Sequence, residues 1–184
     1  MYRMMLYVLT GLLLAGCGGS KTISTSKNAD MPDFVLNPPK ENGALFGTGT
    51  AELKTLQLAK EIADFRACKE ITSALSFKVT MMLKIYLDQA GIGSKSEVKE
   101  LAKLVDRALT DIELTGVSIE KRELANGKIY SLAKYPLDDS MKKLVNEAIS
   151  KSLLSNVDLL SQFQEKRGFI ELDEQLEKMM ASEE

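Results

Sequence analysis

The chain has 184 residues, with 24 basic and 26 acidic side chains and a net charge of −2. This length suits a single domain with short extensions, and the balanced charge offers no basic excess for nucleic acid or anionic lipid headgroups. We therefore expect no nucleic-acid partner. The sequence has no histidine, which removes the commonest general base and the commonest metal ligand.

Residues 1–16 are typical of a secretory signal peptide. Arg3 supplies the basic charge, and the apolar run after it is shorter than the ~20 residues that span a bilayer. Leu14-Ala15-Gly16-Cys17 resembles the lipobox of bacterial lipoproteins. That resemblance implies cleavage before Cys17 and lipidation of its thiol. The alternative is an ordinary signal peptide with a chance cysteine at its end.

The lipid would decide where the protein resides. Two or three acyl chains, such as palmitate, on one residue hold a protein stably at a membrane, whereas a single chain binds only marginally. Gly18 stands where many Gram-negative inner-membrane lipoproteins carry Asp, which implies export to the outer membrane. Exposure to the periplasm or to the cell surface stays open.

Lipidation of Cys17 would leave Cys68 without a disulfide partner in the chain. A buried small apolar side chain is the favoured role of Cys68, and a functional thiol is the alternative. Residues 17–31 are small and polar, and predict a lipidated flexible tether. We place a folded domain at residues 32–154 and an acidic helical tail at residues 155–184.

The first half of the domain predicts a strand, a helix and a second strand. Residues 44–49 are typical of a strand that ends at glycine, and residues 51–75 carry apolar side chains at helical spacing. Residues 77–87 alternate apolar and mainly polar side chains, the pattern of a strand with one buried face.

The second half predicts a helix, a hairpin and another helix. Ser94 and Glu97 form a capping-box pattern at the start of the first of these helices. Residues 112–119 predict a strand with a bulge at Gly116, and Asn126-Gly127 is a strong hairpin signal before a return strand at residues 129–135.

Asp138, Asp139 and Ser140 are candidate N-caps for a helix that ends near Leu154. Residues 158–164 and 169–180 predict further helical segments. The expected order is β-α-β-α-β-β-α with a helical tail. This order indicates an α+β fold in which helices pack on a small, mainly antiparallel sheet.

Few residues suggest chemistry, and each has a structural alternative. Gly47-Thr48-Gly49 could cradle a phosphate, but a strand-end turn is favoured. Asp138 and Asp139 could form a carboxylate pair, but N-caps are favoured. Arg66 predicts a structural ion pair rather than a ligand contact. Lys78, Lys84 and Tyr86 could form a binding face, but a solvated sheet face is favoured. Met179-Met180 could line a partner groove, but helix packing is favoured.

Several pieces in order resemble the twenty-kilodalton outer-membrane lipoproteins, here called the Lpp-twenty type. The pieces are Pro32-Asp33-Phe34-Val35 with Pro38-Pro39, Gly47-Thr48-Gly49, Arg66-Ala67, Leu114-Thr115-Gly116-Val117, and Gly127-Lys128-Ile129-Tyr130-Ser131-Leu132. The resemblance spans residues 32–154. It implies an outer-membrane-anchored α+β domain without catalysis that tends to assemble, and relatives of the FlgP kind are flagellar lipoproteins.

The sequence thus predicts a non-enzymatic lipoprotein that acts by protein contact or self-assembly in the envelope, with a flagellum-associated assembly as one case. We expect lipidation at Cys17 and no catalytic residue, cofactor or metal. A carrier of an apolar ligand, held in a cleft between the long helix and the sheet, is the second hypothesis. An enzyme that acts on the cell wall is a remote third.

Overall fold

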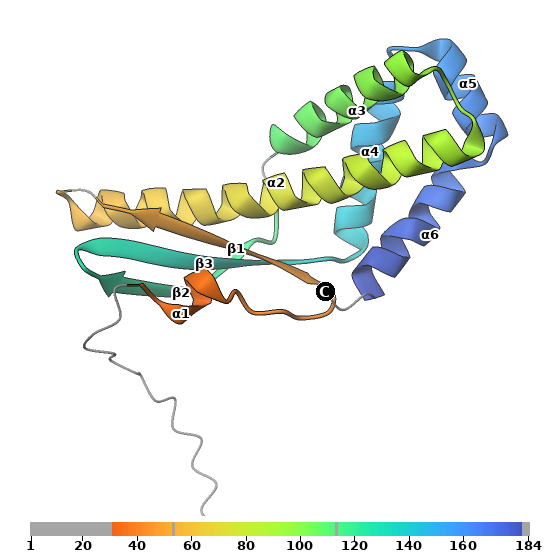
Figure 1. Ribbon diagram of the computed structural model, residues 1–184. Helices are drawn as coiled ribbons and strands as arrows, with labels where there is room; N and C mark the ends of the chain where they lie inside the picture. The colour runs from red at the N-terminus through yellow and green to blue at the C-terminus, as the bar shows by residue number, and fades with distance from the viewer. Residues whose placement is uncertain (1–30, 53, 113, 182–184) are drawn as a thin grey trace, which may run out of the picture.

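The computed structural model describes residues 31–52, 54–112 and 114–181 as an α+β fold (Figure 1). A three-stranded antiparallel sheet packs against helices, which confirms the expected fold class. The predicted signal peptide, Cys17 and nearly all of the predicted tether lie outside the described residues. The elements are α1 (Asp33–Leu36), β1 (Ala44–Ala51), α2 (Leu56–Ala90), α3 (Lys95–Thr110), β2 (Ser118–Ala125), β3 (Lys128–Pro136), α4 (Asp139–Leu153), α5 (Val157–Glu165) and α6 (Gly168–Ala181).

The strands lie in the order β1-β3-β2. The Asn126-Gly127 turn joins β2 to β3 as predicted, and both of its residues have the positive φ, 49° and 74°, that such a turn requires. The predicted bulge is misplaced. Gly116 lies in a turn before β2, with φ 94°, and the register shift falls between Ile119 and Lys121. The strand itself begins at Ser118, not at residue 112.

The strand predicted at residues 77–87 is wrong, because α2 runs unbroken through this segment to Ala90. Side chains at every second position include two sets with a spacing of four, and such sets also suit a helix. In α2, Val79, Leu83 and Leu87 form the buried set, whereas Phe77, Met81 and Ile85 form an exposed set.

Glycines bring β1 unusually close to α2. The buried face of β1 carries Gly47 and Gly49, and α2 presents Ala63 and Ala67 to them. A Cβ on Gly49 would overlap the Ala63 carbonyl oxygen, and one on Gly47 would overlap that of Ala67. Both glycines lie within β1, so the expected strand-end turn is wrong. Close helix–sheet packing explains these glycines.

The opposite face of the sheet is covered in part by α1. The segment after Pro32 forms one helical turn and buries Phe34 against Tyr130 and Leu132 of β3. Lys121 of β2 places its Nζ 5.3 Å from the centre of the Phe34 ring, a cation–π contact. The central strand β3 is therefore covered on both faces.

Helices α3 to α6 gather around the second half of α2, beyond the strands (Figure 1). The predicted capping box is confirmed: Ser94 accepts from the Glu97 N–H, and Glu97 accepts from the Ser94 N–H. Helical segments near residues 158–164 and 169–180 are also confirmed. Leu159, Phe163, Leu172 and Leu176 of these segments are completely or almost completely buried in the main core, so the acidic tail packs with the domain.

Candidate functional site: an apolar groove between two helices

A groove of about 690 Å³ lies between the second half of α2 and α6. We call it the α2–α6 groove. Its α2 wall is the exposed set Phe77, Met81 and Ile85, which are 66%, 41% and 52% exposed. Large apolar side chains with this much exposure, gathered in one groove, are typical of interaction surfaces. The remaining lining residues are Lys78, Met82, Tyr86, Gln89, Glu171, Gln175, Lys178 and Met179.

The exposed set lies on the same side of α2 as the residues that pack near the sheet. Ala59, Ala63 and Ala67 are almost completely buried where α2 packs near the sheet. Phe77, Met81 and Ile85 each follow one of them by eighteen residues, about five turns at 3.6 residues per turn, so they project from the same side of α2. The strands end before this part of the helix (Figure 1). Phe77, Met81 and Ile85, which we call the second stripe of α2, therefore have no sheet beneath them.

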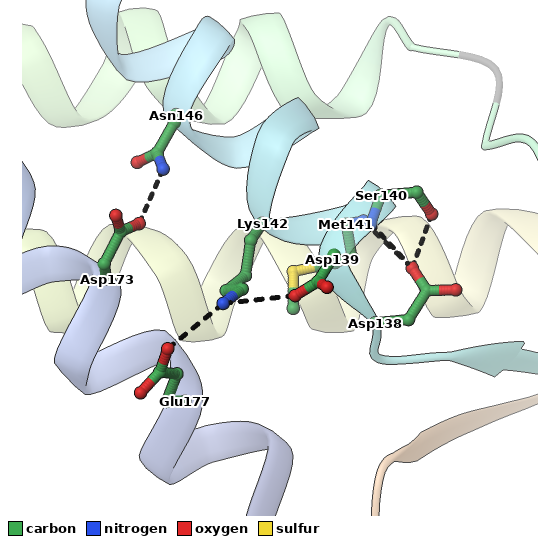
Figure 2. Close-up of polar contacts among 8 residues, drawn as sticks. All are labelled: Asp138, Asp139, Ser140, Met141, Lys142, Asn146, Asp173 and Glu177. Carbon is green, nitrogen blue, oxygen red and sulfur yellow. Dashed lines mark hydrogen bonds and ion pairs between the residues drawn. The ribbon is translucent and has the colours of Figure 1, made fainter.

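The other wall of the groove, α6, is held in place by α4. Leu172 and Leu176 anchor α6 in the core. Figure 2 shows the polar contacts between α4 and α6. Lys142 of α4 lies 3.2 Å from both Asp139 and Glu177. These two carboxylates raise the pKa of Lys142, with the hydrogen bond to Glu177 as the largest cause.

A second α4–α6 contact joins two polar side chains. The Asn146 amide donates to Asp173 over 2.6 Å (Figure 2). The Asn146 Oδ1 is buried and has no hydrogen-bond partner among the residues that the structure describes. The hydrogen bond to Asp173 is a second polar contact that joins α6 to α4.

The turn between α5 and α6 packs against Tyr86, one of the residues that line the groove. The Phe163 ring meets the Tyr86 and Phe169 rings edge-on, at centroid distances of 5.6 and 4.9 Å. The Tyr86 hydroxyl donates to the Lys166 carbonyl over 3.0 Å. A Cβ on Gly168 would lie 2.6 Å from the Phe163 ring. These contacts hold Tyr86 in place on the wall of the groove.

The charged residues of the groove are mixed in sign. Lys78 and Lys178 lie there with Glu171. Burial lowers the pKa of Lys78 and raises that of Tyr86. Within residues 31–52, 54–112 and 114–181, no three Cys, Asp or Glu side chains gather as metal ligands would.

Two of the predicted binding residues line this groove, although the sheet face proposed for them does not exist. Lys78 and Tyr86 lie on α2 and in the groove. Lys84 lies on the same helix and is half-buried. Met179 and Met180 are partly buried against the core, as the helix-packing role predicts. Met179 also lines the groove.

Arg66 acts differently from the prediction. It is exposed, and its guanidinium donates to the Thr50 carbonyl, a backbone acceptor, in place of the expected carboxylate. One turn later, Glu70 accepts from the Thr48 N–H over 2.5 Å and from the Thr48 hydroxyl over 2.9 Å. Strand β1 lies at an edge of the sheet, and every second residue of an antiparallel edge strand points its N–H and C=O away from the neighbouring strand. The two α2 side chains therefore satisfy polar groups along the outer edge of β1.

The aspartate pair has a structural role. The Asp138 side chain caps α4 by accepting from the Ser140 and Met141 N–H groups over 2.9 and 3.2 Å, which confirms the predicted N-cap. The hydrogen bond from the Ser140 hydroxyl is the largest cause of the lowered pKa of Asp138. Asp139 instead contacts Lys142.

Cys68 is half-buried on α2 and packs against the main core. Burial raises the pKa of its thiol, and the charge of Asp64 adds to the effect. A raised pKa leaves less of the reactive thiolate at neutral pH. This environment agrees with the apolar role favoured for the residue.

A polar cluster between α2 and the sheet has no counterpart among the sequence predictions. Asp64 of α2 accepts two hydrogen bonds at 2.8 Å from Arg122 of β2 and one at 2.7 Å from the buried Ser131 of β3. Burial by itself would raise the pKa of Asp64, but these hydrogen bonds and the Arg122 charge lower it. The partners lie 58 and 67 residues away, so no local pattern indicates the cluster.

Comparisons add no family assignment. No protein-family model and no curated protein matches the chain. Among the described residues, no helix combines the length and the apolar character needed to cross a bilayer. The resemblance to Lpp-twenty lipoproteins stays a prediction, and the α2–α6 groove is the feature on which a functional proposal can be built.

Proposed function

We propose that the protein is a lipid-anchored lipoprotein of the bacterial outer membrane, without enzymatic activity, whose domain assembles with further copies of itself. The observation that carries self-assembly is the second stripe of α2, at Phe77, Met81 and Ile85, which lies in an open groove. The lipobox supports the anchor, and the family resemblance favours an envelope assembly, with a flagellum-associated one as a case.

The second stripe suits a two-fold contact with another α2. Its residues are spaced by four and form a ridge, and two such ridges interdigitate at about −50° with the helix axes ~8–10 Å apart. Large apolar side chains, Phe77 and Ile85, lie at equal distances on either side of Met81. In an antiparallel two-fold contact centred on Met81, Phe77 of one copy meets Ile85 of the other.

The helix–sheet interface weighs against the carrier hypothesis. That hypothesis needs an apolar cleft between α2 and the sheet. Gly47 and Gly49 instead let the backbones meet so closely that not even a methyl group fits at either position. Protein contact through the groove is therefore the better proposal.

A disulfide test addresses the two-fold axis directly. Met81→Cys in a Cys68→Ala background places one new thiol at the proposed axis, where two copies would bring their Cβ atoms within the ~3.5–4.5 Å that a disulfide needs. In the oxidising envelope we expect a linked dimer on a non-reducing gel. Leu154→Cys is the matched control, since Leu154 is 68% exposed but does not line the groove. Equal linkage of the two variants, or none for Met81→Cys, would contradict the proposed contact.

The anchor has its own test. Cys17→Ala should move the protein from the membrane fraction to the soluble fraction after cell lysis. Retention of the variant in membranes would refute lipidation at Cys17 and leave the proposed self-association to be judged by the disulfide test alone.

A further inference from the structure

The structure points to a membrane-facing end of the domain. We propose that exposed leucines around the β2–β3 turn dip into the surface of the same bilayer that holds the lipid on Cys17. We call this end, formed by Ala51, Leu56, Leu124 and the Asn126-Gly127 turn, the hairpin end. The inference rests on the proposed lipid anchor.

The chain enters the fold close to the hairpin end. Phe34, three residues after Met31, packs in a cluster with Tyr130, and Ala125 adjoins it. Ala125 directly precedes the turn. The fourteen steps from Cys17 to Met31 can span at most about 50 Å, because an extended chain covers ~3.3–3.6 Å per residue. A lipid on Cys17 therefore keeps the bilayer within about 50 Å of this end.

Three leucines lie uncovered at the hairpin end. Leu124 is 61% exposed and pairs with Ile129 beside the turn. Leu56 and Leu58, in the first turn of α2, are 61% and 47% exposed. They lie here because α2 follows shortly after Ala51, the partner of Ile129 in the β1–β3 ladder.

Single exposed leucines are common on soluble proteins. Here they coincide with the place where the chain arrives from its proposed anchor. Their neighbours suit an interface between lipid and water. Lys128 and Glu52 form a 3.6 Å ion pair with largely exposed side chains, so it can remain among the headgroups while the leucines enter the acyl boundary.

The opposite end of α2 provides an internal control. Ile85 lies twenty-nine residues after Leu56, about 44 Å along the helix at 1.5 Å per residue. Ile85 is 52% exposed, similar to Leu58. With the hairpin end on the bilayer, the α2–α6 groove points away from it, toward neighbouring copies.

A fluorescence experiment tests the orientation. The chain contains no tryptophan, so Leu124→Trp or Leu56→Trp gives a single reporter at an exposed position. The lipidated full-length variants would be reconstituted in phosphatidylcholine vesicles with brominated acyl chains. We expect loss of emission in brominated relative to unbrominated vesicles at both positions, and no such loss for Ile85→Trp.

Flotation of the same samples separates the possible failures. If all variants float with the vesicles and neither hairpin-end reporter is quenched, the membrane-facing end is wrong while the anchor stands. Equal quenching of Ile85→Trp also overturns the proposed orientation. If the wild-type protein fails to float, the lipid anchor is wrong and this inference fails with it.

Discussion

The backbone carbonyl of Ala63 in α2 occupies the space that a side chain on Gly49 of β1 would need. Beside this contact α2 packs on the strands, and five turns later the same side of the helix is left open at Met81. On this side, the first half of α2 is covered by the sheet, whereas the second half is exposed and available for contact.

The first prediction concerns this contact. Gly49→Ala should destabilise the domain by about 1–3 kcal/mol, because an overpacked site forces backbone shifts. Urea unfolding would measure the loss. Thr50→Ala is the matched control, since Thr50 lies on the other face of the same strand, and we expect a change smaller than that of Gly49→Ala. Equal effects of the two variants would contradict the close packing.

The second prediction concerns the outer edge of β1. Glu70→Ala removes the acceptor of both the Thr48 N–H and the Thr48 hydroxyl, and we expect a loss of about 1–2 kcal/mol, since one hydrogen bond has a net value of about 1 kcal/mol. The freed edge can also pair with other chains, so light scattering at high protein concentration should rise. Glu61→Ala is the control, since Glu61 bonds Gln57 on its own helix. No difference between the variants would show that the edge needs no protection.

The third prediction concerns acid. Folding lowers the pKa of Asp64 below its ordinary value, so its ionised form stabilises the fold. This stabilisation is fully present above the unfolded pKa, ~3.9, and disappears as the pH falls through the lower folded value. Asp64→Asn should therefore be less stable than wild type at pH 7, and the difference should shrink at pH 3.

Urea midpoints at the two pH values would measure that difference. Asp88→Asn, an exposed change near the end of α2, is the control and should leave the pH dependence as in wild type. A constant gap between Asp64→Asn and wild type from pH 7 to pH 3 would show that Asp64 does not supply the acid-sensitive stability.

The fourth prediction concerns the α6 wall of the groove. Lys142→Met removes the contacts with Asp139 and Glu177, so amide hydrogen exchange in α6 should become faster while the core of α2 stays protected. Lys143→Met is the control, because Lys143 is the exposed neighbour on α4. Unchanged exchange in α6 would mean that Leu172 and Leu176 alone position the helix.

Local signals in the sequence were reliable where the structure depends on a few adjacent residues. The Ser94–Glu97 box, the Asp138 cap and the Asn126-Gly127 turn satisfy backbone groups or φ angles within four residues. Such patterns fix the ends of elements without regard to the rest of the fold.

Residues 77–87 show where a local pattern is insufficient. Their apolar side chains suit a strand by alternation and a helix by their spacing of four. The absence of Gly and Pro between Thr50 and Gly91 was a further signal, because a helix, a turn and a strand rarely follow one another without such residues. This signal favoured one continuous helix.

The groove and the Asp64 cluster depend on long-range packing. Phe77, Met81 and Ile85 resemble core residues in the sequence, and they are exposed only because the strands end before they reach this part of α2. Similarly, Asp64 meets Arg122 because β2 pairs with β3 beneath α2. No local periodicity in the sequence indicates the exposed groove or the Asp64–Arg122 contact.

By itself, the sequence determined the composition, the caps, the hairpin turn, the α+β class and the expectation of a lipid on Cys17. These follow from propensities and motifs that act over a few residues. Only the tertiary structure decided that one side of α2 is covered by the sheet in the first half of the helix and left open in the second half. That outcome depends on the lengths of the strands and on where α6 packs, and distant parts of the chain set both together.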